Sequence, residues 1–562
     1  MITYIKKNKL TFILSTFLGV LASCATVGLA YIISDITNAV SDYNLNELYR
    51  ILGISIIYLI TTNILLFLFK YNKSKFIKKT VIEIRNDIFN GMLNLDINQY
   101  NFKNTAEYIS ILINDTNILR DSYLSKIFDL ISNCALLVFA IIALCYISPV
   151  IALITITINI IPLIIPVIFS KTLSKLKCEY SNSLSVYTQK IKDLTSGFEV
   201  IKSFNIKHVA IKSHNKDLND VEEANYKNNI FISLVEILAN FSEYMIIILI
   251  FISSGYYIIK NQLNIGTLLA IVQLLNYIGN PIIIISGLTT EIKSTKEIRK
   301  KLSELTKIKE LNHENKVSME EFNSIIKFED VSFSYDGEKK HLNNININFE
   351  KGKKYAIVGS SGSGKSTIIK LLLGYYHNYE GKITIDNINI KDIETKSLYD
   401  LISVIQQNVF MFNDTIKNNI SLYGSYTEEQ IINSLQKSGL DLIVSTLPNG
   451  IDSQIEENAK NFSGGEKQRF AIARSLIKET PILILDEATA NIDNETSLQI
   501  EDTILNIEDL TVIVITHKLY PSILKRYDNI LVINSGEICE QGDFYSLINS
   551  KGIFYSLYNV FN

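Results

Sequence analysis

Six long apolar stretches occupy most of the first 295 residues or so, and they restrict what this chain can fold into more than any other feature. A helix rises 1.5 Å per residue, so about 20 residues cross the roughly 30 Å hydrocarbon core of a bilayer. Helices buried in a large soluble core are the alternative, but such a core needs far fewer stretches of this length. A cleaved signal peptide is the alternative for the first stretch, which is too long and lacks a small-residue cleavage site. We therefore predict membrane-spanning helices at about residues 10–33, 51–69, 127–147, 150–169, 230–259 and 265–290.

The distribution of lysine and arginine predicts how these helices are oriented. Positive residues gather before the first stretch and after the second, fourth and sixth, whereas residues 34–50 hold only Arg50. Positive charge stays on the cytosolic side, so we expect both termini and the second half of the chain in the cytosol. The lysine-rich run at 293–301 adjoins a span and the formal net charge is −3, which favours an orientation signal over a nucleic-acid site. The expected surroundings are a lipid bilayer, with no nucleic-acid partner.

Two long connections on the cytosolic side, residues 71–126 and 171–229, are about 57 residues each. They are charged, amphipathic and poor in glycine and proline, which is typical of membrane helices that continue into the cytosol and turn back. The turns at 98–102 and 195–204 are candidate contacts with a domain below the membrane. Ordinary solvated turns between helices are the alternative.

A glycine-rich loop lies between an apolar strand predicted at 355–358 and a helix predicted from Thr367. The glycines let backbone N–H groups surround phosphates, and the helix N-terminus adds a partial positive charge. Lys365 is expected to reach the β- and γ-phosphates of ATP, and the Ser366 hydroxyl to bind Mg²⁺. The predicted phosphate site comprises Gly359, Ser360, Gly362, Ser363, Gly364, Lys365, Ser366 and Thr367.

Polar residues follow three further apolar strands and supply candidate chemistry. After the strand at 482–485, Asp486 is expected to organise Mg²⁺ through water and Glu487 to polarise the attacking water. Gln407, after 401–405, is expected to bridge the metal, the water and the membrane domain, with neighbouring Gln406 as the alternative. His517, after 512–515, is expected to hydrogen-bond the γ-phosphate, although a lone histidine is more often structural.

A second candidate anion site opens the helix predicted at 466–477. The Ser463 hydroxyl, the amides of Gly464 and Gly465, and the helix dipole all favour a phosphate there. Because the glycine-rich loop already serves the chain's own nucleotide, the spare site indicates an ATP bound by a partner in a head-to-tail pair. Asp493 is expected where the two halves meet. Tyr335 is expected to stack on adenine, with a plain strand aromatic as the alternative.

Taken in order, these residues resemble the ATP-binding cassette superfamily, with its Walker A loop, Q-loop, signature, Walker B strand, D-loop and H-loop. The resemblance covers about residues 325–562, after a linker at 301–324 and a transmembrane domain at 1–300. It implies a multi-domain fold: a six-helix all-α transmembrane domain with long cytosolic helical extensions, followed by an α/β P-loop ATPase domain with a helical subdomain. The whole chain resembles an exporter-type half-transporter, two of which form one transporter.

Several positions depart from the common family pattern. The signature begins with Phe462 and ends with Glu466, where leucine and glutamine are common, and Lys518 replaces a frequent arginine after the histidine. Glu466 would add a negative charge near the partner's nucleotide. No catalytic group is missing, so the chain could form a homodimer with two competent sites or supply the competent half of a heterodimer.

The resemblance implies ATP-driven export of an amphipathic peptide, lipid or drug by alternating access. Import of a substrate such as a metal chelate, and an ATP-gated channel or sensor, are the alternatives. Glu236 and Glu243 lie seven residues apart on the fifth predicted span, where they could bind a cationic substrate or pair helices. Abundant isoleucine, asparagine and lysine, with no tryptophan, indicate an AT-rich bacterial genome and hence a bacterial plasma membrane.

Overall fold

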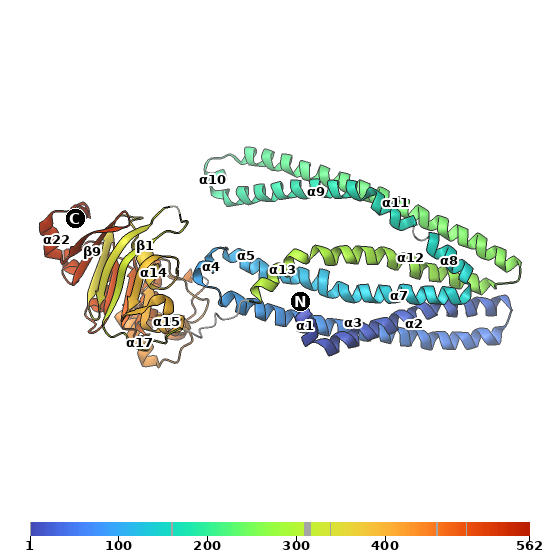
Figure 1. Ribbon diagram of the computed structural model, residues 1–562, viewed down its shortest axis with the longest axis horizontal. Coiled ribbons are helices and arrows are strands. Elements are labelled where there is room, and N and C mark those ends of the chain that lie inside the picture. Colours follow the sequence, from blue (N-terminus) through green and yellow to red (C-terminus); the bar gives the residue numbers. More distant parts are fainter. Residues whose placement is uncertain are drawn as a thin grey trace. The chain divides into compact units, whose positions relative to one another are not determined.

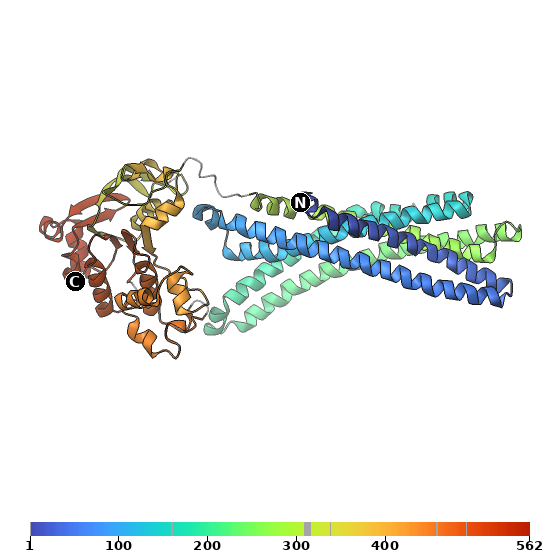
Figure 2. The same cartoon turned by 90° about the horizontal axis from the view of Figure 1, so that it is seen from below.

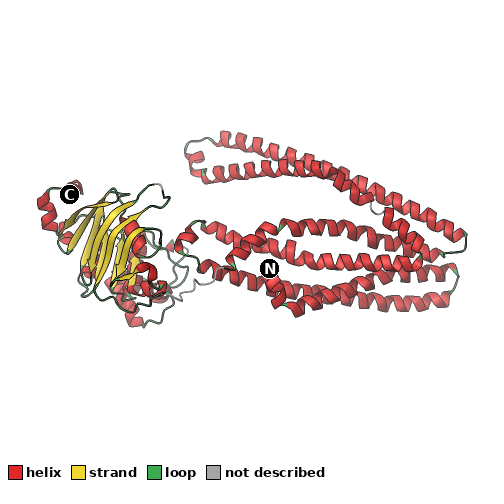
Figure 3. Cartoon of the chain, viewed as in Figure 1, coloured by secondary structure: helices red, strands yellow, loops and turns green. Residues whose placement is uncertain are grey.

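The computed structural model describes residues 2–158, 161–307, 316–337, 339–456, 459–489 and 492–561. The chain divides into two compact units (Figure 1). The first comprises Met1–Leu93 and Lys103–Ile308, and the second comprises Asn94–Phe102 and Lys309–Asn562. Among the described residues, strands occur only from Ile325 onward, in the second unit (Figure 3). This division into a helical unit and a mixed unit matches the predicted fold class.

The first unit contains long apolar helices. Five of the described helices are long and apolar enough to cross a membrane. The fourth predicted span, 150–169, includes residues 159 and 160, which lie outside the described part, with α8 (Pro149–Ile158) before them and α9 (Ile161–Ser196) after them. The five helical segments are Lys9–Ser41, Leu45–Leu93, Thr105–Ile147, Lys207–Ile259 and Ile265–Leu305.

Several of these helices extend far beyond their apolar stretches, as predicted for the cytosolic connections. Helix α3 runs over Leu45–Leu93, and α11 over Lys207–Ile259. Helices α9 and α11 lie side by side, and the short α10 (Phe198–Ser203) joins their ends within the turn predicted at 195–204 (Figures 1 and 2). The other predicted turn forms α4 (Ile97–Asn101), and its residues cluster with the second unit.

Helices α2 (Lys9–Ser41), α3, α7 (Ser125–Ile147) and α12 (Ile265–Ser294) pack together in the first unit. A final helix, α13 (Lys296–Leu305), packs on α3, and its Leu302 and Leu305 are buried. The predicted linker at 301–324 therefore begins inside a helix, because an apolar face continues past the last span. Residues 308–315 of that linker lie outside the described part, and Phe322 is buried in the core of the second unit.

The second unit contains two sheets. The four-stranded sheet has the order β2-β1-β4-β5, with β1 at Ile325–Phe333, β2 at Leu342–Glu350, β4 at Glu380–Ile385 and β5 at Ile388–Asn389. The six-stranded sheet has the order β10-β9-β3-β8-β7-β6, with β3 at Lys354–Gly359, β6 at Ile402–Ile405, β7 at Ile482–Asp486, β8 at Thr511–Ile515, β9 at Asn529–Asn534 and β10 at Glu537–Gly542.

Strands β6, β7, β8, β3 and β9 are parallel to one another, and β10 at the edge is antiparallel to β9. Every residue of β3 and β8 is buried, which is why these strands are apolar without alternation. Their carboxyl ends share one edge of the sheet, where ligands of open α/β sheets bind. A separate group of helices, α16 (Ile416–Ser421) to α19 (Gly464–Leu476), has its own buried cluster and forms the expected helical subdomain.

Candidate functional site

The glycine-rich loop joins β3 to α14 (Lys365–Leu372), as predicted. Gly364 has φ +107° and Gly359 has φ +155°. A Cβ at Gly359 would lie 2.1 Å from the carbonyl oxygen of Ile533, and one at Gly364 would lie 2.7 Å from Leu342 Cδ2. Glycine is therefore required at both positions, because a side chain would push the loop away from the neighbouring strands.

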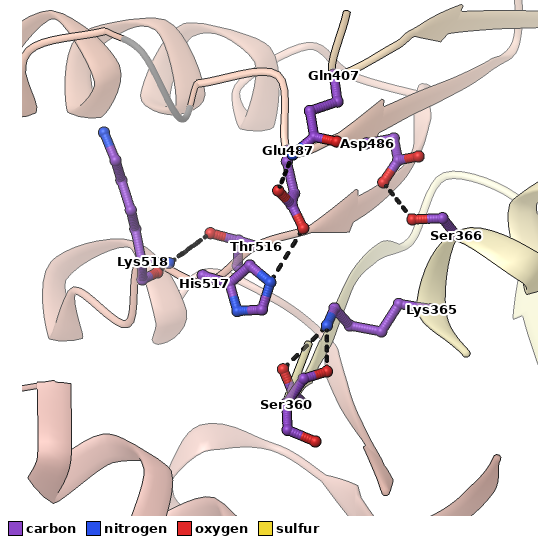
Figure 4. A network of polar contacts seen from close by, with 10 residues as sticks. Ser360, Lys365, Ser366, Gln407, Asp486, Glu487, Thr516, His517 and Lys518 are labelled. Atoms are coloured by element: carbon purple, nitrogen blue, oxygen red, sulfur yellow. Dashed lines mark hydrogen bonds and ion pairs between the residues drawn. The ribbon is translucent and has the colours of Figure 1, made fainter. Parts of the chain in front are cut away.

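The Lys365 ammonium is held inside the loop. Its Nζ donates hydrogen bonds to the carbonyl oxygens of Gly359, at 3.0 Å, and Ser360, at 2.9 Å (Figure 4). Burial lowers the pKa of Lys365, while the charges of Glu487 and Asp486 act in the opposite direction. An anionic phosphate group in the loop would give this buried cation a stronger, charge-assisted partner than a neutral carbonyl.

Two of the three residues predicted to hold Mg²⁺, Ser366 and Asp486, lie together, whereas the side-chain amide of the third, Gln407, donates a hydrogen bond to Glu487. Ser366 Oγ donates a hydrogen bond to Asp486 Oδ1 at 3.0 Å. Burial raises the pKa of Asp486, and the Ser366 hydrogen bond partly offsets this. Mg²⁺ takes few protein ligands at nucleotide sites and completes its shell with phosphate and water. A hydroxyl and a carboxylate beside the phosphate loop fit that preference.

Glu487 lies between the other two predicted catalytic residues. Its Oε2 accepts a hydrogen bond from Gln407 Nε2 at 2.7 Å, and its Oε1 lies 3.0 Å from His517 Nε2 (Figure 4). The three residues follow β6, β7 and β8, which are adjacent and parallel, so their ends meet at one edge. Glu487 has φ +52°, a conformation uncommon for residues other than glycine and frequent at functional sites.

The two neighbouring glutamines have different partners. Gln407 contacts Glu487, whereas Gln406 Nε2 donates to the hydroxyl of Tyr375 at 3.3 Å. Of the two glutamines, Gln407 therefore contacts Glu487, and its action at a nucleotide site stays a prediction.

Tyr335 lies beside the phosphate loop. Its hydroxyl is 3.1 Å from Thr367 Oγ1, and its ring packs edge-on against His341 and Tyr376. The side chain is 41% exposed, so part of the ring is free to contact a base. The position suits the predicted adenine contact, and it also shows a structural role through the aromatic cluster.

Ser463 caps helix α19. Its Oγ accepts a hydrogen bond from the Glu466 backbone N–H at 3.2 Å, and Glu466 Oε2 accepts one from the Ser463 backbone N–H at 2.7 Å. The unusual acid of the signature is therefore used locally, in a capping box that a glutamine could also form. Gly464 is exposed at this helix end, and no hydrogen bond or ion pair among the described residues joins Ser463, Gly464 or Gly465 to the phosphate loop.

Asp493 caps the next helix, α20 (Asn494–Leu505), by accepting a hydrogen bond from Thr496 N at 2.9 Å. The same helix carries a buried acid that sequence reasoning did not single out, Glu501. The signal was present, since Glu501 follows Ile500 and precedes Ile504 on an apolar face. Of the two candidate acids in the fifth span, Glu236 is exposed, and the side chain of Glu243 lies outside the described part.

Comparisons with known proteins agree with this arrangement. Residues 342–490 match the family described as ABC transporter, and residues 12–282 match the ABC transporter transmembrane region. The ATP-dependent lipid A-core flippase of Haemophilus influenzae (strain 86-028NP) is 29% identical over 490 residues, covering 86% of this chain and 83% of the relative. The flippase of Desulfotalea psychrophila is 28% identical over 566 residues, covering 98% and 97%.

A solved structure described as a bacterial Atm1-family ABC exporter with ATP bound superposes with a TM-score of 0.80. It covers 98% of both chains at 20% sequence identity. This likeness confirms the predicted fold class, a helical transmembrane domain followed by a nucleotide-binding domain.

Proposed function

The chain belongs to the ABC transporter family as an exporter-type half-transporter whose ATPase is coupled to transport, and we propose that its substrate is an amphipathic lipid moved outward across a bacterial plasma membrane. The lipid is favoured over a peptide or a drug because the two relatives described above are lipid flippases. Both termini and the ATPase lie in the cytosol in this proposal, as the lysine and arginine distribution indicates.

The placement of Glu487 between Gln407 and His517 carries the mechanistic part of the proposal. Glu487 accepts the proton of the water that attacks the γ-phosphoryl group, and Gln407 orients the carboxylate and the water. His517 hydrogen-bonds the γ-phosphate, and Lys365 binds the β- and γ-phosphates from the loop. Ser366 and Asp486 would hold Mg²⁺, which supplies positive charge against the phosphate oxygens. Tyr335 stacks on the adenine.

Two chains form the working unit in this proposal. The exposed N-terminus of α19, with Ser463, Gly464 and Gly465, binds the ATP held in the partner's loop, and Asp493 lies near the boundary. ATP favours the closed pair through its higher affinity for that state, and closure drives the spans to an outward-open arrangement. Hydrolysis then resets the cycle. The chain keeps all its catalytic groups, which suits either a homodimer or the competent half of a heterodimer.

The ATPase rate of the full chain in lipid nanodiscs tests the site. Glu487→Gln keeps the hydrogen-bonding shape and removes the base, so we expect the rate to fall by about 100-fold or more. ATP binding, measured by equilibrium titration, should remain. A variant that hydrolyses ATP at the wild-type rate would contradict the assignment of Glu487. A folded wild-type chain that binds ATP without hydrolysing it would show that a second, different chain is required.

Direction and substrate need a separate assay in sealed proteoliposomes with the ATPase domain outward. We expect ATP to move a fluorescent phospholipid analogue from the outer to the inner leaflet, because the outer leaflet then corresponds to the cytosolic one. Movement in the opposite direction would indicate an importer. An ATP-dependent ion conductance without lipid movement would indicate a channel.

A further inference from the structure

A buried carboxylate, that of Glu501, contacts the segment that follows Glu487. Glu501, on α20, is 6% exposed, and its Oε1 accepts a hydrogen bond from Thr489 Oγ1 at 2.8 Å. Burial raises the pKa of Glu501, and the Thr489 hydrogen bond and the charge of Lys518 act against that rise. A buried acid is costly unless it is paired, and the charge of Lys518 and the hydroxyls of Thr489, Ser497 and Tyr527 all act against that cost.

Lys518, which follows β8, lies near Glu501 and Ile492. Its Nζ donates a hydrogen bond to the backbone carbonyl of Ile492 at 3.0 Å. Burial lowers the pKa of Lys518, whereas the charges of Glu501 and Asp493 raise it. The backbone N–H of Lys518 is fixed as well, because it donates to Thr516 Oγ1 at 2.9 Å (Figure 4).

These contacts lie next to the groups of the nucleotide site. Lys518 directly follows His517, and Thr489 comes two residues after Glu487. Ile492, whose carbonyl Lys518 binds, precedes the helix cap Asp493. Glu501 therefore holds Thr489, and Lys518, the residue beside His517, holds Ile492.

We propose that Lys518 and Glu501 are positioning residues that hold His517, Thr489 and Ile492 in one arrangement around Glu487. They do not touch the nucleotide, so ATP hydrolysis depends on them while ATP binding does not. This inference rests on the proposed roles of Glu487 and His517. If the cluster only stabilises the domain, its loss should change kcat, KM and thermal stability together.

The test compares Lys518→Met, Lys518→Arg and Glu501→Gln in the full chain in nanodiscs. For Lys518→Met we expect kcat to fall about tenfold, because a hydrogen bond from a charged group is lost. KM for ATP should stay within about twofold of the wild type, since the binding groups are unchanged. Lys518→Arg keeps a cation and its donors, so it should restore most of kcat. Glu501→Gln keeps an acceptor for Thr489 and loses the charge, so kcat should fall less than in Lys518→Met.

Lys478→Met provides a matched control. Lys478 also donates to a backbone carbonyl, that of Tyr399, and lies 4.0 Å from an acid, Asp400, and within the described part of the chain no hydrogen bond or ion pair joins it to the proposed nucleotide site. This variant should keep the wild-type kcat, even if its thermal midpoint falls.

Two results would overturn the inference. The first is an unchanged kcat in Lys518→Met. The second is a lower kcat, a higher KM and a lower thermal midpoint together in Lys518→Met, none of which Lys518→Arg restores. If Lys518→Met does not fold, Glu501→Gln decides, and a wild-type kcat in that variant also overturns the inference. Glu487→Gln separates this failure from failure of the proposed site. If Glu487→Gln is inactive while Lys518→Met is not, only the inference fails. If Glu487→Gln is active, the site assignment itself fails.

Discussion

At the residue scale, two adjacent glutamines after β6 offer a direct test of the site. Gln407→Ala removes a 2.7 Å hydrogen bond to the Glu487 carboxylate. Such charge-assisted bonds contribute about 1.5–3 kcal/mol, so we expect kcat to fall about tenfold or more. Gln406→Ala, which loses only the contact with Tyr375, is the matched control and should stay close to the wild-type rate. Equal effects of the two substitutions would contradict the assignment of Gln407.

The site residues that could be predicted are those whose position depends only on the strand that they follow in the sequence. Lys365, Ser366, Asp486 and Glu487 all follow apolar strands, and the ends of neighbouring parallel strands must meet. The choice between Gln406 and Gln407 depends on which side chain turns towards β7, and sequence spacing only weakly specifies this. The burial of Glu501 could be read from its place on an apolar helix face, but its contacts with Thr489 and its proximity to the charge of Lys518 could not, because they depend on the fold.

At the element scale, the close approach of α3 and α13 requires a residue without a side chain at position 91. A Cβ at Gly91 would lie 2.0 Å from the backbone oxygen of Leu305, so Gly91→Ala must separate the two helices. Overpacking of this kind costs about 1–3 kcal/mol, and we expect a lower thermal midpoint in detergent. Gly53 lies on the same helix, and a Cβ added there has no neighbour within 4 Å among the described residues. Gly53→Ala should therefore change the thermal midpoint little. A lower midpoint in both variants would instead indicate a general sensitivity of α3.

Helix positions were predictable, but several helix ends were not. The continuation of α3 beyond residue 69, where the second apolar stretch ends, was predicted from the amphipathic residues that follow, but its end at Leu93 was not. Residues Ile111–Asp115 and Leu119–Leu124 form π-helical turns. Apolar periodicity gives no warning of them, since they reflect a local change in hydrogen-bond register.

At the scale of the whole molecule, the proposed shared sites predict complementation between two inactive variants. Lys365→Ala disables a chain's own loop, and Ser463→Arg blocks the site that it offers to its partner. In a mixed dimer both defects fall on one nucleotide site and the other stays intact. Random pairing leaves about a quarter of all sites intact, so co-expression should restore about a quarter of the wild-type ATPase rate. No recovery, with mixed dimers verified by two affinity tags, would contradict the shared site.

The chain passes between its two compact units three times, at residues 93/94, 102/103 and 308/309, because Asn94–Phe102 clusters with the ATPase. Cleavage at one position therefore cannot separate the two compact units completely. A fragment that begins at residue 309 leaves nine residues of its own unit behind in the other half. The ATPase rate of such a fragment is the rate of a unit that lacks residues 94–102. The difference between the rate of the fragment and that of the full chain includes the contribution of those nine residues. Dissection by truncation becomes informative here when the missing peptide, residues 94–102, is added back.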